Sequence, residues 1–162
     1  MTGKLIIFTA PSGSGKTTLV KHLLKQDLNL SFSVSATTRE KRAKETDGKD
    51  YYFIDDTTFE KMIEHGDFVE YMKFNGWYYG QTKKDFDKAD VMIMSKDGLD
   101  ILPKKYRDQC IVIYLDPSRM ERFNRLESRN DLNDTIVRRM NTDDEQFKSF
   151  RDYDIRISNA DF

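Results

Sequence analysis

Short, continuous apolar segments alternate with polar stretches along this chain. Residues 5–9, 91–94 and 111–115 are such segments. Strands of parallel sheets have this composition because helices cover both of their faces. Residues 16–26 carry apolar side chains every three or four positions, which predicts a helix between the first two segments. This order of strands and helices predicts an α/β fold with a parallel sheet.

The pattern changes between residues 32 and 82, where shorter segments alternate between apolar and polar positions. Residues 51–54 are aromatic and favour a strand, and residues 68–74 alternate. Residues 57–60 (TTFE) form a capping box that predicts the start of a helix ending near Gly66. We expect an inserted lobe here.

Two further segments follow the strand at residues 111–115. Asp116 and Pro117 predict the start of a helix that carries Met120, Phe123 and Leu126. Residues 125–140 are polar and rich in arginine, which is typical of a mobile flap.

A glycine-rich segment joins the first predicted strand to the first predicted helix. Residues 10–18 read APSGSGKTT. Glycines let backbone N–H groups approach clustered phosphate oxygens, and the following helix offers its positive N-terminal end. The segment matches the phosphate-loop pattern G-x-x-x-x-G-K-[ST] except that Ala10 replaces the first glycine. The alternative, a turn with a chance lysine, is disfavoured by the flanking strand and helix.

The loop residues have separate expected roles in binding a nucleoside triphosphate. Lys16 is expected to contact the β and γ phosphates, and the Thr17 hydroxyl to bind the accompanying Mg²⁺. The candidate triphosphate-binding residues are Pro11, Ser12, Gly13, Ser14, Gly15, Lys16, Thr17 and Thr18.

Length and composition limit the number of domains, the classes of partner and the cellular environment. A length of 162 residues fits one compact domain with small inserted lobes. The 27 Lys and Arg residues nearly balance the 28 Asp and Glu residues, so no overall field attracts a nucleic acid polymer or a membrane. The first apolar run is too short for a signal peptide or a membrane span. The single Cys110 predicts a buried thiol in a reducing cytoplasm.

A second set of residues indicates which kind of protein contains this phosphate loop. Residues 35–42 (SATTREKR) are followed by residues 48–51 (GKDY), by Glu70 among apolar neighbours and by residues 78–80 (YYG). This series resembles the guanylate kinase family, whose members show S-x-T-T-R-x-x-R, G-K-D-Y, a lone Glu and Y-Y-G in this order. The resemblance covers nearly the whole chain.

The resemblance implies a P-loop kinase fold, in which a parallel-sheet core carries an inserted nucleoside-monophosphate-binding lobe and an arginine-bearing lid. The implied division is core 1–33, GMP-binding lobe 34–82, core 83–124, lid 125–141 and core 142–162, without the last helix of the relatives. Residues 155–159 resemble the last core strand and the loop whose asparagine, here Asn159, lies near the adenine of ATP.

The resemblance also implies how the lobe binds GMP. Arg39 and Arg42 would hold its phosphate, because forked guanidinium groups match phosphate oxygens. Glu70 would accept hydrogen bonds from the N1–H and amino groups of guanine, and the Gln81 amide would donate to the base oxygen in place of the family's small hydroxyl residue. The implied GMP-binding residues are Ser35, Arg39, Arg42, Tyr51, Glu70, Tyr79, Gln81 and Thr82.

In the lid, residues 125–129 resemble the family's R-L-x-x-R and residues 136–139 its I-x-x-R-[RL]. Arginines brought over the transferred phosphoryl group neutralise the charge that spreads over its oxygens. The implied catalytic residues are Lys16, Arg39, Arg42, Arg129 and Arg139, with Arg125 and Arg138 behind them.

The chain departs from the family in two places. The family's D-x-D pair after the strand at 91–94 is missing, and Asp97 or Ser95 would have to substitute for it. The chain ends at Phe162, which suits a short, viral-type or mobile-element member. A sheet face is then either covered by something else or left bare, so that a monomer and a homodimer are both open.

These observations together predict a cytoplasmic enzyme that transfers the γ-phosphoryl group of ATP, with Mg²⁺, to GMP or dGMP and gives ADP and GDP or dGDP. Two alternatives stay open. The first is a nucleoside monophosphate kinase with altered base specificity. The second is a non-catalytic guanylate-kinase-like module that binds phosphoproteins, against which the intact phosphate loop argues.

Overall fold

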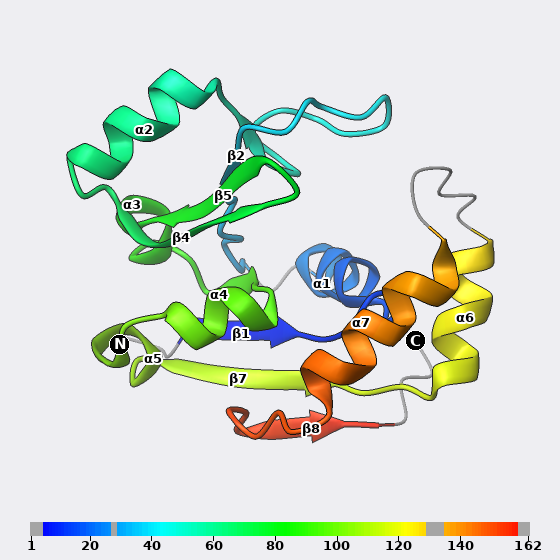
Figure 1. Cartoon of the computed structure of the whole chain (residues 1–162). Helices are drawn as coiled ribbons and strands as arrows, with labels where there is room; N and C mark the ends of the chain where they lie inside the picture. The colour runs from blue at the N-terminus through cyan, green and yellow to red at the C-terminus, as the bar shows by residue number, and fades with distance from the viewer. Residues whose placement is uncertain (1–4, 27–28, 129–134, 159–162) are drawn as a thin grey trace.

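The computed structural model describes residues 5–26, 29–128 and 135–158. Its elements in chain order are β1 (Leu5–Thr9), α1 (Lys16–Lys25), β2 (Ala36–Thr37), β3 (Tyr52–Phe53), α2 (Asp56–Glu64), β4 (Phe68–Phe74), β5 (Trp77–Thr82), α3 (Lys83–Phe86), β6 (Val91–Ile93), α4 (Lys96–Ile101), α5 (Lys104–Arg107), β7 (Cys110–Leu115), α6 (Arg119–Glu127), α7 (Ile136–Phe147) and β8 (Ile155–Ile157) (Figure 1). No helix within these ranges is long and apolar enough to cross a lipid bilayer.

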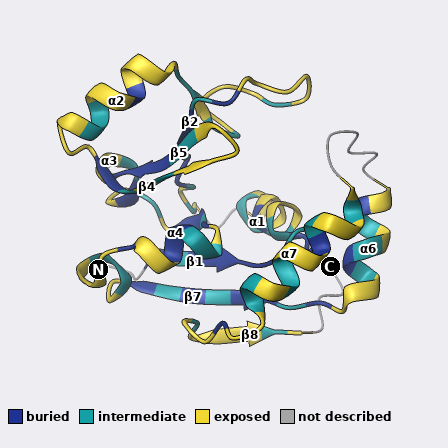
Figure 2. Ribbon diagram, viewed as in Figure 1, coloured by how far each residue is buried: buried dark blue, intermediate teal, exposed yellow. Residues whose placement is uncertain are grey.

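The core is a parallel sheet with the strand order β6-β1-β7-β8, as the apolar segments predicted. Ile7 and Val112 belong to the cluster that faces α4, α5 and α7, and Phe8 belongs to the cluster on the α1 side. Helices therefore cover both faces, which is why β1 is largely buried (Figure 2) and is apolar from Leu5 to Phe8. Cys110 is buried at the start of β7, as predicted.

A second sheet, with the order β3-β2-β5-β4, stands apart from the core and carries α2 on one side (Figure 1). Its small core is aromatic: Phe59 of α2 stacks on Phe68 and on Tyr78, with ring centroids 4.4 and 5.0 Å away. A Cβ on Gly80 would lie 2.8 Å from the Phe68 ring, so only glycine lets β5 approach this stack.

Two helices begin at other residues than the sequence indicated. Asp55, not Thr57, caps α2 and accepts a hydrogen bond from the Thr58 N–H group at 2.7 Å. Ser118 caps α6 in a capping box with Glu121. Asp116, the predicted cap, instead accepts hydrogen bonds from Tyr114 and Arg156, so its carboxylate is used to tie β7 to β8.

The apolar residues of α6 are not all buried. Met120 is 69% exposed, whereas Arg122 is only 5% exposed and lies beside the buried Leu126. The Leu126 side of α6 lies close to the phosphate loop. A Cβ on Gly13 would lie 2.6 Å from the Arg122 carbonyl oxygen and 3.0 Å from Leu126 Cγ.

Replacing Gly13 by alanine is expected to lower the free energy of unfolding by about 2 kcal/mol or more, because a positive φ is strained and the Cβ meets backbone atoms. Gly76 is the matched control: its φ is also positive, but no atom lies within 4 Å of its Cβ position. Gly76→Ala should cost only the backbone strain, about 1 kcal/mol. Urea unfolding of both variants measures the difference, and equal losses would contradict a tight contact at Gly13.

Candidate active site

The phosphate loop connects β1 to α1, and the ammonium group of Lys16 lies across it. Lys16 Nζ donates to the carbonyl oxygens of Ala10 and Pro11 at 2.5 and 3.2 Å. The Ser14 hydroxyl closes the loop by donating to the same Pro11 carbonyl at 2.7 Å. Thr17 and Thr18 lie exposed in the first turn of α1. The structure thus brings residues 11–18 together in one loop and one helix start, whereas Asn159 lies outside the described residues.

The two helices that extend into the predicted lid, α6 and α7, contact this loop directly. The Ser12 N–H group donates to Asp143 Oδ2 of α7 at 2.7 Å, and Arg125 Nη1 of α6 donates to the Ser14 carbonyl at 3.1 Å. Arg138 and Arg139 lie in the first turn of α7. Arg129 lies outside the described residues. Sequence reasoning missed Asp143, because an acidic residue in a polar helix carries no signal of its own.

The donor set of the loop fits magnesium only together with a polyphosphate. Within the described ranges, no three His, Cys, Asp or Glu side chains come together to hold a metal ion. Mg²⁺ commonly keeps several waters and takes substrate phosphates as ligands, so a single protein ligand such as the Thr17 hydroxyl suits it.

A compact cationic and aromatic cluster forms in the second lobe. The guanidinium group of Arg39 lies 5.7 Å from the ring centroids of Tyr51 and Phe53, and the Tyr51 and Tyr79 rings are 6.1 Å apart. Burial and the neighbouring Tyr79 raise the pKa of the Tyr51 hydroxyl, which therefore remains a hydrogen-bond donor. The structure thus groups three of the predicted GMP-binding residues, Arg39, Tyr51 and Tyr79.

Glu45 holds Arg39 and the backbone of Arg42 in place, although the sequence motifs did not indicate this residue. Its carboxylate accepts a hydrogen bond from Arg39 Nη2 and another from the backbone N–H of Arg42, each at 2.8 Å. Burial alone would raise the pKa of Glu45, but these two hydrogen bonds and the charge of Arg39 hold that pKa below its usual value. The sequence feature that could have identified Glu45 is its place as an acidic residue shortly after the R-x-x-R segment.

The predicted base-binding residues meet where the second sheet joins the core. Glu70 and Gln81 are cross-strand partners on β4 and β5. The fully buried Gln81 amide accepts from the Ser35 hydroxyl at 3.0 Å and donates to the Ser33 hydroxyl at 2.6 Å. Gln81 therefore connects the two chain segments that lead into the lobe. Thr82 caps α3 and exchanges hydrogen bonds with Asp85.

Glu70 is a carboxylate in an unfavourable place for a charge. Burial raises its pKa to about 7, and the hydrogen bond from the Gln81 backbone N–H only partly opposes this effect. The start of α4 lies against it, because a Cβ on Gly98 would be 3.5 Å from Glu70 Oε2. Such an acid is poised to accept hydrogen bonds from a ligand that replaces the lost water.

The positions that follow β6 take structural roles here. The Ser95 hydroxyl caps α4 by accepting from the Gly98 N–H group at 3.1 Å. Asp97 accepts from Gln146 Nε2 of α7, with both carboxylate oxygens 3.4 Å away. The structure thus ties Asp97 to α7.

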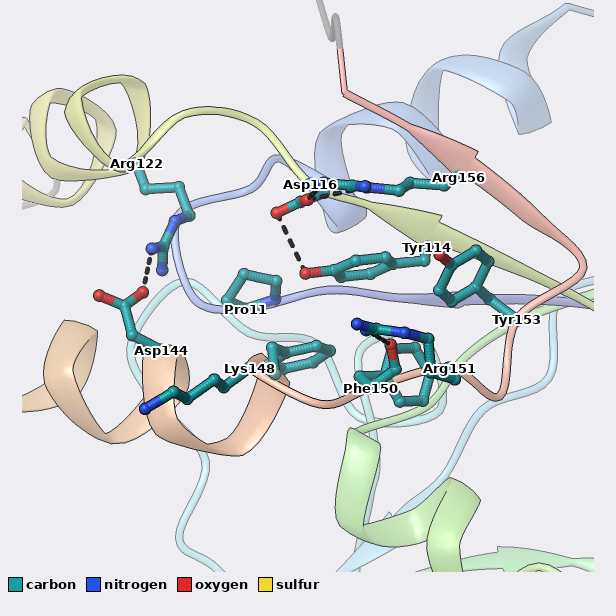
Figure 3. Close-up of a pocket in the computed structure, with 11 residues that line it drawn as sticks. Pro11, Tyr114, Asp116, Arg122, Asp144, Lys148, Phe150, Arg151, Tyr153 and Arg156 are labelled. Atoms are coloured by element: carbon teal, nitrogen blue, oxygen red, sulfur yellow. Dashed lines mark hydrogen bonds and ion pairs between the residues drawn. The ribbon is translucent and has the colours of Figure 1, made fainter.

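A cavity of about 450 Å³ lies beside the loop, on the face of the sheet that α7 covers. Figure 3 shows Arg122 and Asp144 pairing at one end, and Tyr114, Asp116 and Arg156 at the other. Of the described residues predicted to bind ATP, only Pro11 lines it. The cavity is therefore distinct from the mouth of the phosphate loop.

Comparison with known proteins agrees with this geometry. The sequence model described as guanylate kinase matches residues 2–162. The chain belongs to the guanylate kinase family. A guanylate kinase of Chlorobium chlorochromatii is 41% identical over 84% of this chain and 75% of its own length. Guanylate kinases of Myxococcus xanthus and a Nostoc species are 37% and 36% identical over 99% and 100% of this chain and 80% and 85% of theirs.

The fold is similar to that of a family member as well. The crystal structure of guanylate kinase from Anaplasma phagocytophilum matches with a TM-score of 0.73 and 25% identity, over 98% of this chain and 78% of that one. Members of this family are nucleoside monophosphate kinases. These relatives are bacterial, and they give no support to the expectation of a viral-type protein.

Glu70→Gln is expected to raise the free energy of unfolding at pH 8 by up to about 3 kcal/mol. The folded-state pKa of about 7 exceeds the ordinary 4.5, so the wild type loses stability as the pH rises through 7 and the carboxyl ionises in a buried place. Below pH 4.5 both variants are neutral at this position and the difference should vanish. Urea unfolding at several pH values measures this, and a constant difference would contradict the raised pKa.

Proposed function

We propose that this chain transfers the γ-phosphoryl group of ATP to GMP or dGMP, giving ADP and GDP or dGDP. The observation that carries the proposal is that two separate sets of cationic and polar groups occur in one member of this family. One is the phosphate loop of the core with Lys16, and the other is the Arg39, Tyr51 and Tyr79 cluster of the second lobe.

The second cluster suits the phosphate of the acceptor. Arg39 and the backbone of Arg42 already surround one anionic group, the Glu45 carboxylate. A nucleoside monophosphate would bring a second anion to the same donors, joined by the Tyr51 and Tyr79 hydroxyls. Glu45 thereby keeps the buried Arg39 charged and oriented before the acceptor arrives.

Glu70 and Gln81 would select guanine. Guanine presents N1–H and an amino group side by side, and an ionised Glu70 accepts from both. Adenine presents an unprotonated N1 at that edge, which would face the carboxylate without a hydrogen bond. Leaving such a buried group unpaired costs about 1 to 3 kcal/mol, and more for a charge. The Gln81 amide has one more N–H to offer to the base oxygen.

Phosphoryl transfer would depend on alignment and charge neutralisation by residues of both sites. Lys16 would move its ammonium group from the loop carbonyls to the β and γ phosphates, and the arginines at the lid would approach the transferred group. When Mg²⁺ is bound with ATP, it neutralises phosphate charge, and the Thr17 hydroxyl would be its protein ligand. Closure of residues 34–82 and 125–141 toward the core would exclude water.

We place this reaction in the cytoplasm, where ATP is available and the buried Cys110 would stay a thiol. The proposal also places Asn159 near the adenine of ATP. It further includes a protein that is a monomer or a homodimer. Size-exclusion chromatography with light scattering tests the oligomeric state.

A coupled assay of ADP release over GMP, dGMP, AMP, dTMP and a sugar phosphate tests the function. We expect kcat/KM for GMP or dGMP to exceed that for AMP by about 100-fold or more, and Lys16→Ala to lower kcat by about 100-fold. Equal or faster turnover of a non-guanine acceptor would favour altered base specificity. Absence of turnover with every acceptor would favour a binding module.

The KM for GMP is expected to be about tenfold higher at pH 6 than at pH 8, because only ionised Glu70 accepts both guanine hydrogen bonds and its pKa is about 7. Glu70→Gln is the control: its KM should be higher throughout, and it should keep only the pH dependence that the phosphate of GMP contributes. Identical pH profiles of the two proteins would remove Glu70 from the base site.

A further inference from the structure

Asp143 makes a contact that the predicted lid does not account for. Its carboxylate reaches from the middle of α7 to the phosphate loop, where Oδ2 accepts from the backbone N–H of Ser12 at 2.7 Å. A backbone donor cannot turn away as a side chain can, so the bond fixes this point of α7 against the loop.

The spacing of residues along α7 places Asp143 on the same helix face as Arg139. Arg139, Asp143 and Gln146 are separated by four and three positions, which places them on one face of the helix. Gln146 contacts Asp97 of α4, so this face lies along the core at two points. Arg139 is half-buried, whereas Arg138 is exposed. Arg139 therefore belongs to the docked face and lies about 6 Å closer than Asp143 to the start of α7, within the predicted lid.

The adjacent residue, Asp144, joins α7 to α6. It pairs with Arg119 and with the buried Arg122, and Figure 3 shows the Arg122 guanidinium turned toward it. Burial lowers the pKa of Arg122, and the charge of nearby Asp143 opposes this effect. Arg122 thus compensates the negative charge that Asp143 brings close to a phosphate-binding loop, while its own backbone touches Gly13.

We infer that Asp143 is a positioning residue for phosphoryl transfer. By hydrogen bonding to Ser12 N–H it sets the register of α7 on the phosphate loop, and this register places Arg139 over the phosphates of the bound nucleotide. The inference rests on the proposed kinase function and adds to it a residue that does not contact the reacting atoms.

The positioning role of Asp143 depends on its hydrogen-bond acceptor and not on its charge. Two substitutions separate these two properties. Asp143→Asn keeps an acceptor oxygen for Ser12 and removes the charge. Asp143→Ala removes both. Glu145→Ala, on the exposed side of the same helix, is the control for the loss of one negative charge from α7.

Steady-state kinetics of these variants, alone and combined with Arg139→Ala, test the inference. We expect Asp143→Ala to lower kcat about tenfold and to change KM for ATP and GMP less than threefold. Asp143→Asn and Glu145→Ala should stay within threefold of wild type. In the Arg139→Ala background, Asp143→Ala should lower kcat less than threefold further, because the residue it positions is already missing.

Three results would overturn the inference: an unchanged kcat in Asp143→Ala, an equal loss in Asp143→Asn, or a full tenfold loss in the Arg139→Ala background. Thermal unfolding identifies loss of the fold, and Asp143→Ser, whose hydroxyl is too short to reach Ser12, then replaces the alanine variant. An inactive wild-type protein would refute the proposed function instead, so the two failures are distinguishable.

Discussion

The contact between the phosphate loop and α6 is the constraint on which the rest of this structure depends. Gly13 has a positive φ and lies so close to the Arg122 carbonyl that no side chain fits there. Arg125 and Asp143 hold the neighbouring loop residues Ser14 and Ser12. Three consecutive residues of the loop are thus fixed by α6 and α7, the two helices that extend into the predicted lid.

Two clusters hold an arginine largely away from water, and in each of them the arginine has a local acidic partner. Glu45 compensates Arg39 in the second lobe, and Asp144 compensates Arg122 beside the phosphate loop. Glu70 has only a backbone donor, and its pKa rises to about 7. Buried charges of this kind contribute little net stability, since desolvation offsets the attraction. Their effect is to hold the charged groups in fixed orientations.

Where prediction and structure differ, long-range contacts decided the outcome. Asp116 and Pro117 are a sound local signal for a helix start, yet Asp116 pairs with Arg156 of a strand far along the chain, and Ser118 takes the cap. Met120 of α6 is exposed, whereas Arg122 is buried and pairs with Asp144 of α7. Such partners are distant in sequence, so no local pattern contains them.

By itself, the sequence determined the parallel core, the phosphate loop and the family, because continuous apolar strands, loop glycines and motif order are local properties of the chain. It also indicated Arg39, Tyr51, Glu70 and Tyr79 as one set. Only the tertiary structure revealed Glu45 and Asp143, and only it gave Gln81 and Asp97 their partners. Polar side chains can pair with many neighbours, and packing of the whole chain decides which neighbour comes within hydrogen-bond distance.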